Sequence, residues 1–110
     1  MPSEAIENPL SVTTATEGGQ TVVGVSGEVD AASADTLRNA IFEVIDGDDP
    51  RVTVDMGEVS FMDSSGLRVL IAGYKAAEQA GGALTVRNPS DVVQRLLEIT
   101  GQLDRFVPGK

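Results

Sequence analysis

The sequence predicts an α/β domain built on a mixed β-sheet of four to five strands, with helices packed mainly on one face. Apolar and polar residues alternate in segments 52–56 and 84–87, as in half-buried strands. Apolar residues instead recur every three to four positions in segments 37–45, 67–77 and 92–99, which indicates amphipathic helices. Together these periods favour strands and helices in alternation along one chain.

The first elements expected along the chain are a flexible arm and a hairpin. Residues 1–9 are polar, contain two prolines and are expected to form an N-terminal arm. Residues 10–110 are expected to form one domain, because a chain of 110 residues is long enough for a single core but not for two. Glu17-Gly18-Gly19-Gln20 reads as a hairpin turn between strands near 10–14 and 21–26, which must therefore run antiparallel.

Capping and turn residues predict the next elements. Ser33 is a candidate N-cap for a helix over Ala34–Ile45, which ends at Gly47-Asp48-Asp49-Pro50. The strand at 52–56 follows, and then a helix over Ser64–Ala80 that ends at Gly81-Gly82.

The C-terminal part predicts a strand, a helix and a second strand. After the alternating residues 84–87, Asn88-Pro89-Ser90-Asp91 provides a capping residue, a proline and an acid, and starts a helix over Pro89–Thr100. The apolar face of this helix is expected to contain Val92, Val93, Leu96, Leu97 and Ile99. Leu103, Phe106 and Val107 are expected to add a last edge strand.

The alternation of segments 52–56 and 84–87 also excludes a class of folds. Strands covered by helices on both faces are apolar throughout, so polar alternation indicates helices mainly on one face. A doubly wound nucleotide-binding fold is disfavoured, and the first strand is followed by no glycine-rich phosphate loop.

Composition excludes most catalytic machinery. The chain has no histidine and no cysteine, so Ser-His-Asp and Cys-His catalysis, imidazole or thiolate metal sites and disulfides are unavailable. We therefore expect no enzyme activity, no cofactor and no metal.

No apolar run approaches the roughly 20 residues that a membrane span needs, and the N-terminus lacks a signal-peptide pattern, so a cytoplasmic protein is expected.

The net charge of −9 arises from 17 acidic and eight basic residues. Such a surface repels nucleic acids and anionic membranes, so neither is expected as a partner, and an effect on transcription would pass through another protein. Solubility alone is an equally good explanation of the charge.

Residues 61–67, Phe-Met-Asp-Ser-Ser-Gly-Leu, stand where strand periodicity gives way to helix periodicity. A serine hydroxyl at such a junction is held by rigid elements near unpaired backbone N–H groups, which favour negative charge. Ser64 is therefore suited to carry a phosphate. Asp63 and the serines are also ordinary helix-capping residues, and taken alone the motif is explained by capping.

The order of elements, with Gly27-Glu28-Val29-Asp30 after the second strand and Asp63-Ser64-Ser65-Gly66-Leu67 opening the second helix, resembles the STAS domain family. The resemblance extends from about Leu10 to Val107 and is strongest to the single-domain anti-sigma-factor antagonists.

The resemblance implies a partner switch. The unphosphorylated antagonist binds a kinase-type anti-sigma factor and so releases the sigma factor; the kinase then phosphorylates Ser64, and a phosphoserine phosphatase resets the switch. It also implies that the docking surface includes Asp30, Met62, Asp63, Ser65, Gly66 and Leu67. Asp30 is equally well explained as a loop anchor, and Ser65 as a cap. A STAS scaffold that does not switch, in a larger signalling or transport-associated complex, is the alternative function.

Arg68 departs from the small residue that the family often has at this position. It lies four residues after Ser64 and hence on the same face of the expected helix. It is either an exposed helix arginine or a partner of Asp63 or of a phosphate on Ser64, and we include it among the candidate docking residues.

Overall fold

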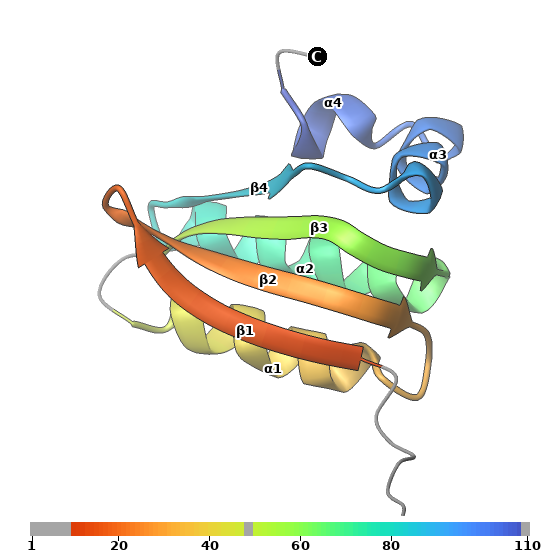
Figure 1. The fold of residues 1–110 in the computed structure, drawn as a ribbon. Coiled ribbons are helices and arrows are strands. Elements are labelled where there is room, and N and C mark those ends of the chain that lie inside the picture. The colour runs from red at the N-terminus through yellow and green to blue at the C-terminus, as the bar shows by residue number, and fades with distance from the viewer. Residues whose placement is uncertain (1–9, 48–49, 109–110) are drawn as a thin grey trace, which may run out of the picture.

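The computed structural model describes residues 10–47 and 50–108, so the arm expected at residues 1–9 lies outside the described residues. The helices and strands within these ranges are shown in Figure 1. In chain order they are β1 (Leu10–Glu17), β2 (Gln20–Val29), α1 (Ala34–Ile45), β3 (Arg51–Met62), α2 (Ser64–Gln79), β4 (Ala83–Arg87), α3 (Asp91–Ile99) and α4 (Leu103–Phe106). The order of elements confirms the expected α/β class.

The strands form one mixed sheet in the order β1-β2-β3-β4. β1 and β2 are antiparallel, whereas β2 with β3 and β3 with β4 are parallel. Gly18 and Gly19 form the expected hairpin turn with φ of +56° and +85°, which glycine adopts without the steric penalty that a Cβ brings. Each parallel pair is connected by a helix, as parallel strands require.

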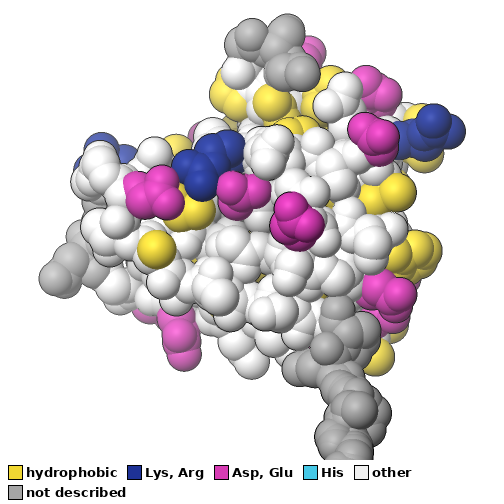
Figure 2. All heavy atoms as spheres, viewed as in Figure 1, with side chains coloured by type: hydrophobic (Ala, Val, Ile, Leu, Met, Phe, Trp, Pro, Cys, Tyr) yellow, Lys and Arg dark blue, Asp and Glu magenta, His cyan; other side chains and the backbone are white. Residues whose placement is uncertain are grey.

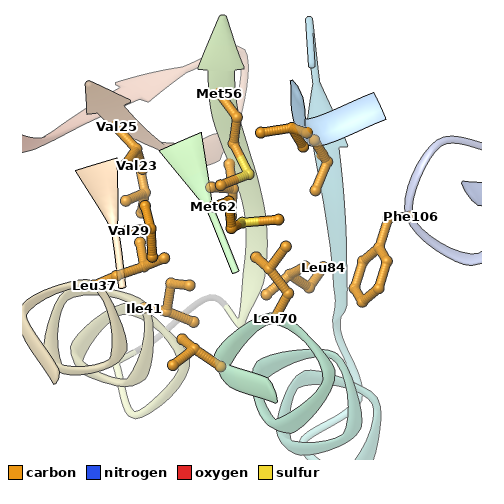
Figure 3. Packing of buried hydrophobic residues seen from close by; sticks show 14 of the residues in the cluster. Val23, Val25, Val29, Leu37, Ile41, Met56, Met62, Leu70, Leu84 and Phe106 are labelled. Carbon is orange, nitrogen blue, oxygen red and sulfur yellow. The ribbon is translucent and has the colours of Figure 1, made fainter. Parts of the chain in front are cut away.

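The hydrophobic core lies between the sheet and the helices α1 and α2. Both helices cover the same face of the sheet (Figure 1), and Leu37 and Ile41 of α1 and Leu70 of α2 are completely buried against it (Figure 3). Helix α4 lies beside β4, the edge strand, and α3 packs near the end of β3. The prediction of helices mainly on one face is therefore confirmed.

The other face of the sheet is open and polar. On it, Arg87 of β4 contacts Asp55 of β3 at 3.0 Å and Glu17 of β1 at 3.2 Å, and this row of charges crosses the face shown in Figure 2. Hydrogen bonds to Asp55 and then to Glu17 raise the pKa of Arg87 above its ordinary value, so the guanidinium stays charged. Glu17, Asp55 and Arg87 thus reach water on this face, whereas Thr53 is only 5% exposed and donates a hydrogen bond to the Gln20 side chain at 2.8 Å.

β3 is longer than the strand expected at 52–56 and continues to Met62. The β2–β3 pairing shifts register between Gly24 and Ser26 and again between Gly27 and Glu28. Each shift breaks the strict alternation of faces, so sequence periodicity does not indicate the second half of the strand.

The edge strand expected at Leu103, Phe106 and Val107 is wrong, because Leu103–Phe106 forms the short helix α4. Phe106 is fully buried, and its ring meets the ring of Tyr74 in α2 edge-to-face, with centroids 5.7 Å apart. Leu103 and Phe106 are three residues apart, so one helical turn directs both toward the body of the protein, and the sheet keeps four strands.

α3 begins two residues later than expected. Its N-cap is Ser90, whose hydroxyl accepts a hydrogen bond from the backbone N–H of Val93 at 3.4 Å, whereas Asn88 adopts a left-handed conformation with φ of +56°.

None of the helices in residues 10–47 and 50–108 is both long enough and apolar enough to span a membrane.

Candidate functional site

The candidate site lies where the loops after β2 and β3 meet. These strands are parallel, and their last residues, Val29 and Met62, are register partners. The backbone N–H of Asp63 donates a hydrogen bond to the carbonyl of Val29 at 3.2 Å. Because the carboxyl ends of parallel strands share one edge of a sheet, the turn beginning at Asp30 and the start of α2 are neighbours there.

Asp63 is the N-cap of α2. Its carboxylate accepts a hydrogen bond from the backbone N–H of Ser65 at 2.9 Å, and its carbonyl accepts from the backbone N–H groups of Gly66 and Leu67. The capping interpretation of the motif is therefore correct for Asp63. The cap fixes the position of the first helical residue, Ser64.

Ser64 and Ser65 differ in accessibility. Ser64 is exposed, and within residues 10–47 and 50–108 its hydroxyl makes no hydrogen bond. Ser65 is half-buried, and its backbone N–H is the group that Asp63 caps. Of the two neighbouring hydroxyls, that of Ser64 is the one open to an enzyme that approaches from solvent.

Asp30 anchors its own turn. Its carboxylate accepts hydrogen bonds from the backbone N–H groups of Ala32 and Ser33 at 3.0 and 3.1 Å. The hydroxyl of Ser33 lies 2.9 Å from the carbonyl of Glu28, to which it donates, and accepts from the backbone N–H of Asp30 at 3.0 Å. Ser33 precedes α1 as expected but makes no side-chain capping bond, because its hydroxyl is used in this turn.

Met62, Gly66 and Leu67 lie below the site rather than on its surface. The exposed fractions of the Met62 and Leu67 side chains are 6% and 8%, and Gly66 is buried. A Cβ on Gly66 would lie 2.7 Å from side-chain carbons of both Met62 and Val29, the last residues of β3 and β2. Glycine thus lets the first turn of α2 pack directly on β2 and β3, and these three residues support the surface from within.

We expect Gly66→Ala to lower the free energy of unfolding by about 1–2 kcal/mol, because overpacking outweighs the better helix propensity of alanine. Urea denaturation followed by circular dichroism measures the change. Gly47→Ala is the matched control, since a Cβ at that position has only ordinary contacts of 3.4 Å or more. Equal stability of the Gly66 variant and the wild type would show that the first turn of α2 has room to adjust.

Arg68 is exposed on α2, and in the described part of the chain it makes no ion pair. The pairing with Asp63 considered from the sequence is therefore not present. Within the same ranges, no group of three or more acidic, histidine or cysteine side chains is arranged to hold a metal ion.

Sequence reasoning missed a group of exposed apolar side chains beside this site. Val92 and Ile99 were expected in the core, but their exposed fractions are 40% and 74%, and that of Phe61 is 46%. The core face of α3 consists of Val93 and Leu97, both fully buried. The available signal was the width of the apolar stripe, since five of the nine residues of α3 are apolar, more than one buried face requires.

Comparison with known proteins gives consistent matches. A family model described as "Mlab, STAS domain" matches residues 12–108. The anti-sigma-B factor antagonist of Bacillus subtilis is 37% identical over 83 residues, which cover 74% of each chain.

Solved structures extend these matches to the fold. An anti-sigma factor antagonist from Mycobacterium paratuberculosis is 31% identical with a TM-score of 0.75, over 90% of this chain and 83% of the other. The phosphorylated form of the Bacillus cell fate determinant SpoIIAA is 22% identical with a TM-score of 0.68, over 84% of this chain and 85% of the other. The region matched by the family model contains both the Asp30 turn and the Ser64 junction.

Proposed function

The chain belongs to the STAS domain family, among the anti-sigma factor antagonists, and from this we propose that its unphosphorylated form binds a kinase-type anti-sigma factor and so releases a sigma factor. Antagonists of this family are regulatory proteins rather than enzymes. In this proposal, phosphorylation of Ser64 by the bound kinase ends the interaction. The observation that carries it is the exposed Ser64 hydroxyl, which the Asp63 cap holds at the start of a helix.

The site geometry gives this switch a physical basis. A phosphate on Ser64 adds about −1.5 to −2 charges and three acceptor oxygens beside Asp63. A partner surface that fits a neutral hydroxyl then meets both repulsion and added volume. Backbone N–H groups at the start of α2 stabilise the phosphate by about 0.3–1 kcal/mol, so the modified chain keeps its fold.

The switch requires no rearrangement of the domain. Asp63 caps α2 through the backbone of Ser65, and the Asp30 turn is closed by its own hydrogen bonds. Neither set of contacts uses the Ser64 hydroxyl. Modification therefore changes the surface that a partner meets while the packing beneath it, at Met62, Gly66 and Leu67, stays as it is.

The proposed partners are proteins: the kinase-type anti-sigma factor, and a phosphoserine phosphatase that restores the hydroxyl. Asp30, Asp63, Ser65 and Arg68 flank Ser64 and are the proposed contacts on this chain. The net charge of −9 disfavours nucleic acids and anionic membranes. A cytoplasmic location follows from the proposed role in transcription.

Incubation of the purified chain with candidate kinase-type anti-sigma factors and ATP tests the proposal. We expect intact-mass analysis to show one added phosphate, peptide mapping to place it on Ser64, and Ser64→Ala to remain unmodified. Ser65→Ala tests the choice between the two neighbouring hydroxyls: it keeps the Ser64 hydroxyl and should still gain one phosphate, on Ser64.

Phosphate on Ser65, Ser60 or Thr53 would contradict the assignment. A chain that enters a stable complex of several subunits and is never modified would instead indicate the scaffold role.

A further inference from the structure

The large hydrophobic side chains exposed in residues 10–47 and 50–108 gather in one place. Phe61 of β3 and Val92 and Ile99 of α3 are exposed by 46%, 40% and 74%. Together with Leu96 they line a groove of about 460 Å³ between the end of β3 and α3, to which Met62 and the exposed charged residues Asp91 and Arg95 also contribute. We refer to Phe61, Val92, Leu96 and Ile99 as the apolar patch. Figure 2 shows hydrophobic side chains at the right of the view, where Figure 1 places α3 and the end of β3.

The patch is a second apolar stripe of α3, distinct from the stripe that faces the core. Val93 and Leu97 are fully buried, whereas Val92, Leu96 and Ile99 follow one another at spacings of four and three residues and lie along a neighbouring face. Single exposed apolar residues are normal on a protein surface. A contiguous apolar groove rimmed by charged residues is instead typical of an interaction site.

The patch adjoins the proposed kinase-docking surface. Phe61 precedes Ser64 by three residues, and because consecutive Cα atoms are 3.8 Å apart, the two Cα atoms lie within about 11 Å of each other. A protein–protein interface of ordinary size buries about 800 Å² on each partner, equivalent to a disc of roughly 16 Å radius. A partner centred on Ser64 therefore also covers Phe61.

We propose that the apolar patch is a second contact for the kinase-type anti-sigma factor, and that it binds an apolar helix or loop of that protein. The inference rests on the proposed function, because it names the same partner. Charge favours this occupant over a second copy of the chain, since two molecules with a net charge of −9 repel each other.

The two contacts have different physical characters. Burial of the apolar patch is insensitive to salt and slows dissociation, whereas charges around Ser64 act on association and are screened by salt. A phosphate on Ser64 adds charge and volume at the start of α2 but removes no apolar surface from the patch. The patch therefore contributes the same affinity in both phosphorylation states, and the switch depends on the Ser64 contact.

The test measures association and dissociation rates of the kinase that modifies Ser64, at low and high salt. We expect Phe61→Ala and Ile99→Ser each to weaken binding about 10-fold at both salt concentrations, mainly through faster dissociation. The control, Ala80→Ser, places a serine at an exposed apolar position outside the patch, at the C-terminal end of α2, and should bind like the wild type. Circular dichroism verifies that each variant is folded.

Three results overturn the inference. Patch variants that bind within about twofold of the wild type show that the patch is not part of the interface. Variants that abolish a dimer of the free wild-type chain in sedimentation show that a second copy is the occupant. A wild-type chain that neither binds nor is phosphorylated by any such kinase refutes the proposed function itself, and with it this inference.

Discussion

Ser64→Asp is expected to weaken binding to the kinase-type anti-sigma factor by about 100-fold, and phosphorylation of Ser64 by at least as much. Ser64 is exposed at the start of α2, so the added carboxylate stands beside Asp63 at the centre of the proposed interface. A charge desolvated there without a partner costs several kcal/mol, about 2–5 in comparable interfaces. Ser64→Ala adds neither charge nor volume and is expected to bind nearly as well as the wild type while resisting modification.

Surface plasmon resonance with the immobilised kinase measures these affinities. Thr16→Asp is the matched control, because it adds the same charge at an exposed position far from Ser64. Thr16 pairs with Thr21 at the start of β2, whereas Ser64 follows the opposite, C-terminal end of the parallel strands β2 and β3. It should bind within about twofold of the wild type, as expected for a surface substitution outside the interface. If Ser64→Asp and Thr16→Asp weakened binding equally, total charge rather than the position of Ser64 would control the interaction.

Phe106→Ala is expected to lower the free energy of unfolding by about 3–5 kcal/mol, a large share of the roughly 5–15 kcal/mol typical of a domain. The side chain is completely buried, and its ring contacts Tyr74 of α2 edge-to-face at 5.7 Å between centroids. Its removal leaves a cavity beside β4 and detaches α4 from the body of the domain.

Urea denaturation followed by circular dichroism measures this loss. Phe106→Leu keeps most of the volume and should cost much less than Phe106→Ala. Ile99→Ala truncates a side chain that is 74% exposed and should change stability by no more than about 0.5 kcal/mol. If Phe106→Ala unfolded at the same urea concentration as the wild type, α4 would contribute nothing to the core.

Local patterns in the sequence determined most of the helices and the position of the candidate site. The helix expected over Ala34–Ile45 has those bounds in the structure, and the helix expected over Ser64–Ala80 ends one residue earlier, at Gln79. Helical spacing and caps act within a few residues, so they can be read from the sequence. For the same reason Asp63, as the cap, placed Ser64 at the first position of α2.

The tertiary structure alone decided the features that depend on which distant segments meet. Leu103 and Phe106 lie in the helix α4, where Phe106 packs on Tyr74, 32 residues earlier in the chain. Gly66 is buried because α2 packs on Val29 and Met62. Val92 and Ile99 are exposed although they share the apolar composition of Val93 and Leu97. Periodicity indicates that a residue prefers an apolar environment, but the packing of the other elements decides whether the protein itself provides that environment.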